Sequence, residues 1–168
     1  MKTFATPQEL VSAAGQRLGE SPFQLVDQAR VNAFAELTGD RQWIHTDPER
    51  ARAGPFGRPV VHGFLALSLL TAMLGDIFRV EGADLVLNKG LDRLRFRTPV
   101  PVGARVRAVA DLASATLRPR GFTEAVVTVA LELEHRADPA LTVHQRLLYH
   151  SSTPASTTEV PASTTEVR

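Results

Sequence analysis

Asp40 and His45 are the two residues of this sequence best suited to proton transfer. On one continuous helix, five residues apart, their side chains would point about 140° away from each other. Gly39 directly precedes Asp40 and predicts a loop, in which both side chains can converge on one water molecule. A carboxylate and an imidazole placed in this way act as an acid and base pair near neutral pH. The alternative is that Asp40 caps a turn and His45 packs against Trp43.

A second candidate is the pair His62 and Gly63, at the start of a long apolar segment. The first turn of a helix has unpaired N–H groups and a partial positive charge. Because Gly63 has no side chain to block an oxygen atom, its amide would form an oxyanion site for a carbonyl that gains negative charge. The alternatives are that Gly63 only permits close helix packing and that His62 is structural. Ser68 and Thr71 are candidates to line a cavity, although hydroxyls in buried helices more often bond to the backbone.

Metal and thiol chemistry have little support in the sequence. The chain has no cysteine, which excludes a disulfide framework, a thiol nucleophile and cysteine ligands for a metal. Asp40, His45 and Asp47 offer metal-type ligands, but Asp47 is better used as the cap of a helix that starts at Pro48. We therefore predict no metal site.

Arginines alternate along one predicted strand, at Arg93, Arg95 and Arg97. Further basic residues lie near them, at Lys89, Arg105 and Arg107. This group either grips the phosphates of an extended cofactor or is a solvated face of a sheet. No glycine-rich phosphate loop and no G-x-S-x-G elbow accompanies it.

The element that must position these groups is the apolar segment at residues 58–78. From residue 60 onward it has no polar stripe, and a helix that is hydrophobic all round is buried on all sides. Polar residues interrupt it, and it is too short to be a convincing membrane span. We therefore expect the rest of the chain to wrap around one long central helix.

Shorter helices are predicted before this segment and strands after it. Capping signals predict helices at residues 7–14, 28–38 and 48–53, with a short strand at 23–26, a turn at 16–22 and a loop at 39–47. Alternating polar and apolar residues predict antiparallel strands at 85–87, 91–97, 104–113, 122–134 and 141–149. Helices followed by a run of strands indicate an α+β fold with an antiparallel sheet, not a doubly wound parallel sheet.

The 168 residues predict one domain at residues 1–150, followed by a flexible appendage at 151–168 in which PASTTEV occurs twice. The formal net charge of +1 argues against nucleic acid or a membrane surface as the main partner. The first 15 residues contain no apolar run typical of a secretory signal, so a cytoplasmic protein is expected.

Residues 34–70 carry a long ordered motif, of which Thr38-Gly39-Asp40, Ile44-His45-Thr46-Asp47 and Val61-His62-Gly63-Phe64 are the conspicuous parts. This motif resembles the signature of the MaoC-like, (R)-specific enoyl-CoA hydratases, also called hydratase 2. The segment at residues 91–106 is similar to the strand that follows the central helix in that family. The resemblance covers about residues 20–150.

The resemblance implies the hotdog fold, an antiparallel sheet wrapped around one long buried central helix. It implies that Asp40 and His45 are the catalytic pair, that the Gly63 amide is the oxyanion donor, and that substrate contacts come from Gln42, Ser68 and Thr71. The implied reaction is reversible hydration of trans-2-enoyl-CoA to (R)-3-hydroxyacyl-CoA, with the thioester as substrate and no further cofactor. Hotdog proteins usually pair through their sheets, so a homodimer is also implied.

Two positions depart from the usual family pattern: Gln42 replaces an Asn, and Trp43 replaces a Pro at what we expect to be the rim of the site. The D-R-Q-W-I-H variant is similar to that of mycobacterial-type hydratases. Two rival functions are a hotdog acyl-CoA thioesterase and a non-catalytic subunit that binds acyl thioesters. The Asp40–His45 spacing argues against the first, and the retention of Asp40, His45 and Gly63 argues against the second.

Overall fold

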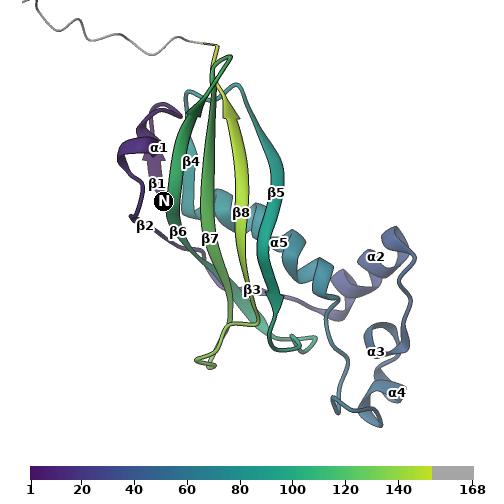
Figure 1. Cartoon of the computed structure of the whole chain (residues 1–168). Coiled ribbons are helices and arrows are strands. Elements are labelled where there is room, and N and C mark those ends of the chain that lie inside the picture. Colours follow the sequence, from purple (N-terminus) through teal and green to yellow (C-terminus); the bar gives the residue numbers. More distant parts are fainter. Residues whose placement is uncertain (153–168) are drawn as a thin grey trace, which may run out of the picture.

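The computed structural model describes residues 1–152, so the predicted appendage lies outside the described residues from residue 153 onward. Two layers dominate the fold, an antiparallel sheet and one long helix, α5, that crosses one face of the sheet (Figure 1). The predicted α+β class and the hotdog arrangement are confirmed. The elements in chain order are β1 (Lys2–Phe4), α1 (Glu9–Ser12), β2 (Arg17–Glu20), β3 (Gln24–Leu25), α2 (Gln28–Thr38), α3 (Trp43–Thr46), α4 (Pro48–Arg52), α5 (Gly63–Ile77), β4 (Phe78–Val80), β5 (Leu85–Phe96), β6 (Arg105–Arg118), β7 (Phe122–Leu133) and β8 (Leu141–His150).

The sheet has the strand order β2-β6-β7-β8-β5, with β3 pairing beside β2 on strand β6. All pairs within this sheet are antiparallel, whereas β1 and β4 form a separate parallel pair. Burial alternates strictly along β8, as expected when one face of a strand packs on a core and the other is partly solvated. The buried set of β8 faces α5 and supplies the floor of the core, through Leu141, Val143, Gln145, Leu147 and Tyr149.

Helix α5 is buried on one side only, which corrects the prediction of burial on all sides. Leu65, Leu70 and Met73 pack into the core, at 8%, 1% and 0% exposure. Phe64, by contrast, is 67% exposed. The sheet covers one side of the helix, and within residues 1–152 no element covers the other. An apolar helix face left open to solvent in a single chain is a feature of surfaces that meet a partner.

Three local predictions are also corrected. Residues 16–22, predicted as a turn, contain strand β2, which pairs with β6 through its backbone and lacks an alternating apolar pattern. The predicted loop at 39–47 contains the single helical turn α3, closed by bonds from the His45 and Thr46 amides to the Gln42 carbonyl. The two predicted strands at 85–87 and 91–97 are one strand, β5, because backbone pairing with β8 continues past an irregularity between Asn88 and Gly90.

A second irregularity in β5 decides which way its last side chains point. The register against β8 shifts between Asp92 and Arg95. Because side chains alternate between faces, one extra residue moves every later side chain to the other face. Beyond the shift, Phe96 lies opposite Leu141 on the side toward α5, and Arg95 lies opposite Thr142 on the other side. The bulge therefore aims Phe96 at the helix and Arg95 away from it.

Helices α2, α3 and α4 lie beyond one end of the sheet, near the start of α5 (Figure 1). Their ends are fixed by the predicted signals: the Asp27 side chain accepts from the Arg30 amide, and Asp47 caps α4 by accepting from the Arg50 amide. Gly39 ends α2 in the left-handed conformation, with φ of 77°. This sharp exit directs the next residue, Asp40, back toward α5. Among residues 1–152, no helix is long and apolar enough to cross a membrane.

Candidate active site

His45 is held in a defined orientation inside the turn α3. It is 8% exposed, and its ring atom Nδ1 lies 2.6 Å from the Val60 carbonyl oxygen. A carbonyl only accepts, so in the neutral ring Nδ1 carries the proton and donates, which leaves a lone pair on Nε2. The Gln28 side chain adds a bond of 2.7 Å to the His45 carbonyl and so ties α3 to α2. The result is an imidazole in the tautomer that a base requires.

Burial is the main cause that lowers the pKa of His45, and the neighbouring His62 lowers it further. The bond to the Val60 carbonyl and the charge of Asp40 act in the opposite direction and do not overcome burial. Because its pKa is lowered, His45 keeps the Nε2 lone pair at neutral pH and also at pH values at which an ordinary histidine would already be protonated. His45 is therefore suited to accept a proton.

Asp40 lies in the exposed segment between α2 and α3, where its carboxylate Oδ1 is 3.4 Å from the Gln42 amide nitrogen. Its backbone carbonyl accepts a bond of 2.9 Å from Nε2 of His62. A carboxylate oxygen of Asp40 and one ring nitrogen each of His45 and His62 all lie within 4.8 Å of one another. The predicted convergence of Asp40 and His45 is therefore present in the structure.

These three groups also form the composition of a two-histidine, one-carboxylate metal site, which the sequence prediction did not include. The rings of His45 and His62 are stacked, with centroids 3.9 Å apart and planes inclined by 27°. A metal must lie in the plane of each imidazole that binds it, about 2.1 Å from the nitrogen. Planes so nearly parallel do not meet at that distance. The arrangement therefore fits an acid and base pair better than a metal.

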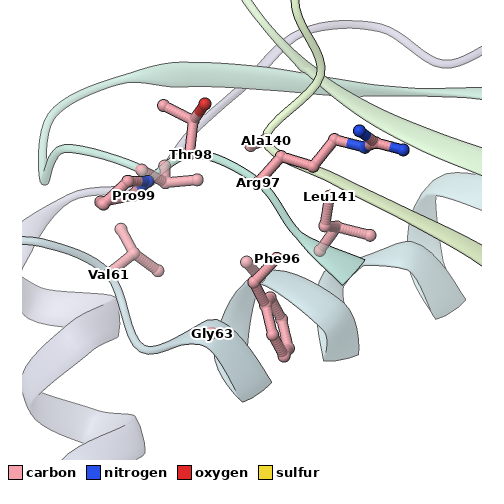
Figure 2. A pocket seen from close by; sticks show the side chains of 10 residues that line it. Val61, Gly63, Phe96, Arg97, Thr98, Pro99, Ala140 and Leu141 are labelled. Carbon is pink, nitrogen blue, oxygen red and sulfur yellow. The ribbon is translucent and has the colours of Figure 1, made fainter. Parts of the chain in front are cut away.

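Gly63, the first residue of α5, lines a cavity of about 230 Å³ at the end of the sheet. Figure 2 shows the Phe96 ring beside Gly63, with Val61, Pro99 and Leu141 on the other walls. A Cβ atom on Gly63 would lie 3.1 Å from the Phe96 ring, so the glycine also serves close packing, the alternative considered above. As the first residue of the helix, its N–H has no partner within the helix and remains available to an oxyanion.

Further along α5, two hollows lie between the helix and strands β5 and β8. They have volumes of about 310 and 370 Å³ and share Thr71, Asn88 and Gln145; we call them together the Thr71 groove. Residues four apart lie on one face of a helix, so Gly63 and Thr71 belong to one face, with Leu67 between them. Thr71 thus lines a hollow, as the sequence suggested, although this groove and the Gly63 cavity share no lining residue.

Other predicted contacts are placed less directly. Ser68 lines the groove, but its hydroxyl donates to the Phe64 carbonyl at 2.7 Å, the helix-backbone bond considered as an alternative. Gln42 is exposed at the start of α3. It contacts the site through its backbone amide, which faces the Asp40 carboxylate. Trp43 stacks on Arg50 at 4.6 Å and packs against Gly54, toward α4.

Sequence reasoning did not assign a site role to Phe96, Asn88 or Gln145. Phe96 was hidden because its direction depends on the bulge, which leaves no sequence signal. The buried amide of Gln145 donates to Asn88 at 2.7 Å across strands β8 and β5. The polar Gln145 in an otherwise apolar alternation was the one signal available, because buried polar side chains need a partner.

The basic residues divide into two groups. Lys89, Arg105 and Arg107 form ion pairs with glutamates, so they are neutralised and drop out of the predicted phosphate grip. The other group, Arg93, Arg95 and Arg97, lines a hollow of about 390 Å³ with Thr142 and His144. Within the described residues none of these three arginines is paired with a carboxylate. Arg97 also lines the Gly63 cavity (Figure 2), so the two hollows adjoin at this residue.

Comparison with known proteins agrees with this geometry. The profile of the MaoC like domain matches residues 9–135. The chain belongs to the MaoC-like family. This MaoC-like chain is 43% identical over 149 residues to 3-hydroxyacyl-thioester dehydratase Z of Mycobacterium tuberculosis (strain H37Rv), covering 89% of the chain and 99% of the relative. It is 37% identical over 103 residues to the (R)-specific enoyl-CoA hydratase of Aeromonas caviae, covering 57% and 74% of the two proteins.

Solved structures support the fold of the MaoC-like chain. The (R)-hydratase of A. caviae involved in PHA biosynthesis superposes with a TM-score of 0.65 at 28% identity, over 80% of this chain and 94% of that one. A monoamine oxidase regulatory protein of Archaeoglobus, at 21% identity, superposes with a TM-score of 0.71 over 90% and 98% of the two chains. At that identity the second likeness concerns the fold alone.

Proposed function

We propose that this MaoC-like chain catalyses the reversible hydration of a trans-2-enoyl thioester of coenzyme A to the (R)-3-hydroxyacyl thioester. The observation that carries the proposal is the convergence of the Asp40 carboxylate and the His45 ring beside the first turn of α5. Relatives named as a 3-hydroxyacyl-thioester dehydratase and an (R)-specific enoyl-CoA hydratase support the same reaction class. An enzyme of this class is a hydro-lyase.

One water molecule takes part in the proposed reaction. Nε2 of His45 removes a proton from the water while its oxygen bonds to C3 of the enoyl group, and the Asp40 carboxylate orients the water by accepting its other hydrogen. The thioester becomes an enolate, whose oxygen accepts from the Gly63 N–H at the positive end of the helix. Protonated His45 then returns the proton to C2 on the same face. One water is added in total, and no further cofactor is needed.

The two ends of the substrate have different environments in this proposal. The acyl chain lies in the Thr71 groove, where Thr71 and the Asn88–Gln145 amide pair provide polar contacts among apolar walls. The phosphates of the coenzyme lie on Arg95 and Arg97, which carry no neutralising partner among the described residues and adjoin the Gly63 cavity. A reaction in fatty acid metabolism within the cytoplasm is consistent with such a substrate.

We further propose that the active form is a homodimer. Strand β5 forms an edge of the sheet, and nine of its twelve residues are exposed in the single chain, including Leu85, Leu87 and Leu91. A long apolar edge strand is a template for pairing with another strand. A second copy would cover both this edge and the open side of α5. Related folds in the ChsH1-ChsH2 and HadBC complexes are heteromeric, so a different partner chain is the alternative outcome.

The deciding experiment follows the absorbance of the enoyl-thioester band with crotonyl-CoA and a longer enoyl-CoA. His45→Gln is expected to lower kcat by about 10²- to 10⁴-fold, the contribution of a placed base. Asp40→Asn is expected to lower kcat by about 10²-fold, because the attacking water is no longer oriented. His135→Gln is the matched control, because His135 lies just after β7 and its side chain is 90% exposed. It should retain wild-type turnover.

Three other outcomes would contradict the proposal. Release of free thiol would indicate a thioesterase. Substrate binding without any chemical change would indicate a non-catalytic acyl-thioester subunit. Near wild-type turnover in Asp40→Asn or His45→Gln would remove that residue from the mechanism.

A further inference from the structure

His62 is a buried histidine that contacts every part of the proposed catalytic centre. It is 2% exposed, its Nε2 lies 2.9 Å from the Asp40 carbonyl oxygen, and its ring stacks on His45 at 3.9 Å. In the chain it directly precedes Gly63. Phe34 of α2 packs on the ring as well, with centroids 5.1 Å apart. One side chain thus links Asp40, His45 and the start of α5.

The hydrogen bonds of the two histidines require opposite tautomers. His62 must carry its proton on Nε2, because the Asp40 carbonyl only accepts, whereas neutral His45 carries its proton on Nδ1. The second ring nitrogen of His62, Nδ1, is buried and has no hydrogen-bond partner within residues 1–152. A buried polar atom without a partner carries a desolvation cost that nothing repays. Such a cost is typical of functional positions, because a purely structural core favours an apolar residue there.

We propose that His62 is the positioning residue of the active site: its Nε2–H anchors the Asp40 backbone, and its stacked ring orients and tunes His45. This proposal deepens the hydratase function proposed above and rests on it. His62 itself touches no reacting atom. It acts through the two residues that do.

Each contact has its own physical effect. The segment that carries Asp40 is exposed. Its bond to His62 ties the Asp40 backbone to a buried side chain. A catalytic group displaced by about 1 Å can lose 10²-fold in rate. The stack acts on protonation instead, because a second imidazole near His45 disfavours its charged form.

The groups that face His45 come from three elements. Asp40 faces it from the segment before α3, and His62 faces it from the start of α5; these are the titratable ones. Helix α2 contributes the uncharged Gln28 side chain, which bonds to the His45 carbonyl. The approach to the ring of His45 is therefore controlled by one carboxylate and one histidine. Replacing His62 leaves Asp40 as the remaining titratable neighbour.

Two variants separate the two contacts. His62→Gln retains an N–H donor for the Asp40 carbonyl but loses the ring, and His62→Phe retains a stacked ring but loses the donor. We expect His62→Phe to lower kcat about 10- to 100-fold with KM changed less than about threefold, because Asp40 is no longer anchored. Both variants should move the acidic limb of the kcat/KM pH profile upward, by about 0.3 to 1 pH unit. Val129→Ala, which creates a cavity beside the distant strand β7, controls for general destabilisation. It should leave the acidic limb of the pH profile in place.

NMR on the wild-type chain tests the inference without activity or mutation. Nitrogen-detected histidine spectra should report Nε2–H on His62 and Nδ1–H on His45, and the His45 titration should rise in His62→Phe. Nδ1–H on His62, or an unchanged acidic limb and kcat in both variants, would overturn the positioning role. A lower melting temperature as the only effect of both variants would also overturn the positioning role. If the wild type does not hydrate enoyl-CoA but the tautomers and titration are as expected, the proposed function fails and the positioning role stands.

Discussion

At the scale of single residues, the proposed catalytic site is organised around two imidazole rings that stack on each other. His45 and His62 donate to backbone carbonyls through different ring nitrogens, Nδ1 in one ring and Nε2 in the other. Backbone carbonyls do not titrate, so these anchors persist over a wide pH range. The free carboxylate of Asp40 and the lone pair of His45 remain for a ligand. In the proposed mechanism, contacts with the backbone therefore fix the geometry of the site, and the side chains are left to bind and transfer protons.

Gly63→Ala tests the amide of the helix start at the same scale. A Cβ atom there would lie 3.1–3.3 Å from the Phe96 ring, so that ring must move by a few tenths of an ångström. Alanine favours the helix by about 0.5–1 kcal/mol over glycine, which offsets the contact. We expect a melting temperature within a few degrees of wild type and kcat lowered about tenfold or more, measured by enoyl-CoA absorbance, because the methyl group narrows access to the N–H.

The double variant Gly63→Ala, Phe96→Leu tests whether the alanine lowers activity by blocking access to the N–H of residue 63 or by its contact with the Phe96 ring. Leucine removes the ring that the methyl group meets. If activity returns with Phe96→Leu, only packing against the ring mattered. If it stays low while the fold is stable, the amide of residue 63 needs the open approach that the oxyanion role requires.

At the scale of elements, strand β5 determines the shape of the site. Its bulge before Arg95 turns Phe96 toward the Gly63 cavity and Arg95 toward the basic hollow, while Arg97 lines both. Arg93 takes φ of 53° at this bulge, a backbone conformation that non-glycine residues seldom adopt. Bulges and strained backbone are frequent beside functional sites, where they redirect side chains. The same strand presents an unpaired edge to a partner.

Leu91→Lys tests the role of β5 as an interface. Leu91 is exposed on this edge strand, and a charge there opposes pairing with a second strand. We expect analytical ultracentrifugation to show a dimer for the wild type and a shift toward monomer for the variant. Enoyl-CoA turnover should fall as well, both because the open side of α5 would lose its cover and because Leu91 lines the Thr71 groove, so the oligomeric state is the deciding measurement.

Leu117→Lys is the matched control, since Leu117 is also exposed but lies at the end of β6, away from the edge. It should leave the dimer intact. A dimer that persists in Leu91→Lys would place the interface elsewhere, and a monomeric wild type would remove the homodimer proposal.

At the scale of the whole molecule, the sheet is tied together on the face away from α5 by a cluster of charges around Glu124. The Glu124 side chain is 4% exposed and receives bonds from Lys89 of β5, Arg118 of β6 and Arg146 of β8. The hydrogen bond from Lys89 is the largest cause that lowers the pKa of Glu124 to about 2. One carboxylate thus joins four strands. Such a cluster favours a single strand register, because any slip leaves a buried charge unpaired.

Glu124→Gln should make the stability of the molecule less dependent on pH. A carboxyl with a lowered pKa stabilises the fold fully above its ordinary value of 4.5, and this contribution is lost as pH falls toward about 2. We expect the variant to be less stable than the wild type by about 1–3 kcal/mol at pH 7. The difference in urea unfolding should shrink between pH 4.5 and 2. Glu134→Gln, which removes a partly exposed pair with Arg105 at 3.6 Å, is the control and should change stability by less than about 0.5 kcal/mol.

A difference for Glu124→Gln that stays constant from pH 7 to pH 2.5 would contradict this assignment. The loss would then come from packing, because a packing defect does not titrate.

Local sequence signals were sufficient for much of the fold. The caps at Asp27 and Asp47 and the glycine after α2 mark helix ends through bonds made within a few residues. Alternating polar and apolar residues predicted β7 and β8, because one face of each strand is buried. Strand β2 escaped prediction because its pairing is made by backbone atoms, which carry no residue signature. The turn α3 escaped because one helical turn is too short to show a period.

The sequence by itself determined the class of fold, the ends of the main helices and the residues with suitable chemistry, Asp40, His45 and Gly63, because these depend on residue type and short spacing. Tertiary structure alone decided that His62 joins them, that Phe96 faces Gly63, and that Lys89 is neutralised while Arg95 is not. Each of those facts depends on contacts between segments far apart in the chain and on strand register. A one-residue shift in register reverses the faces of a strand without altering its composition, so no local pattern encodes it.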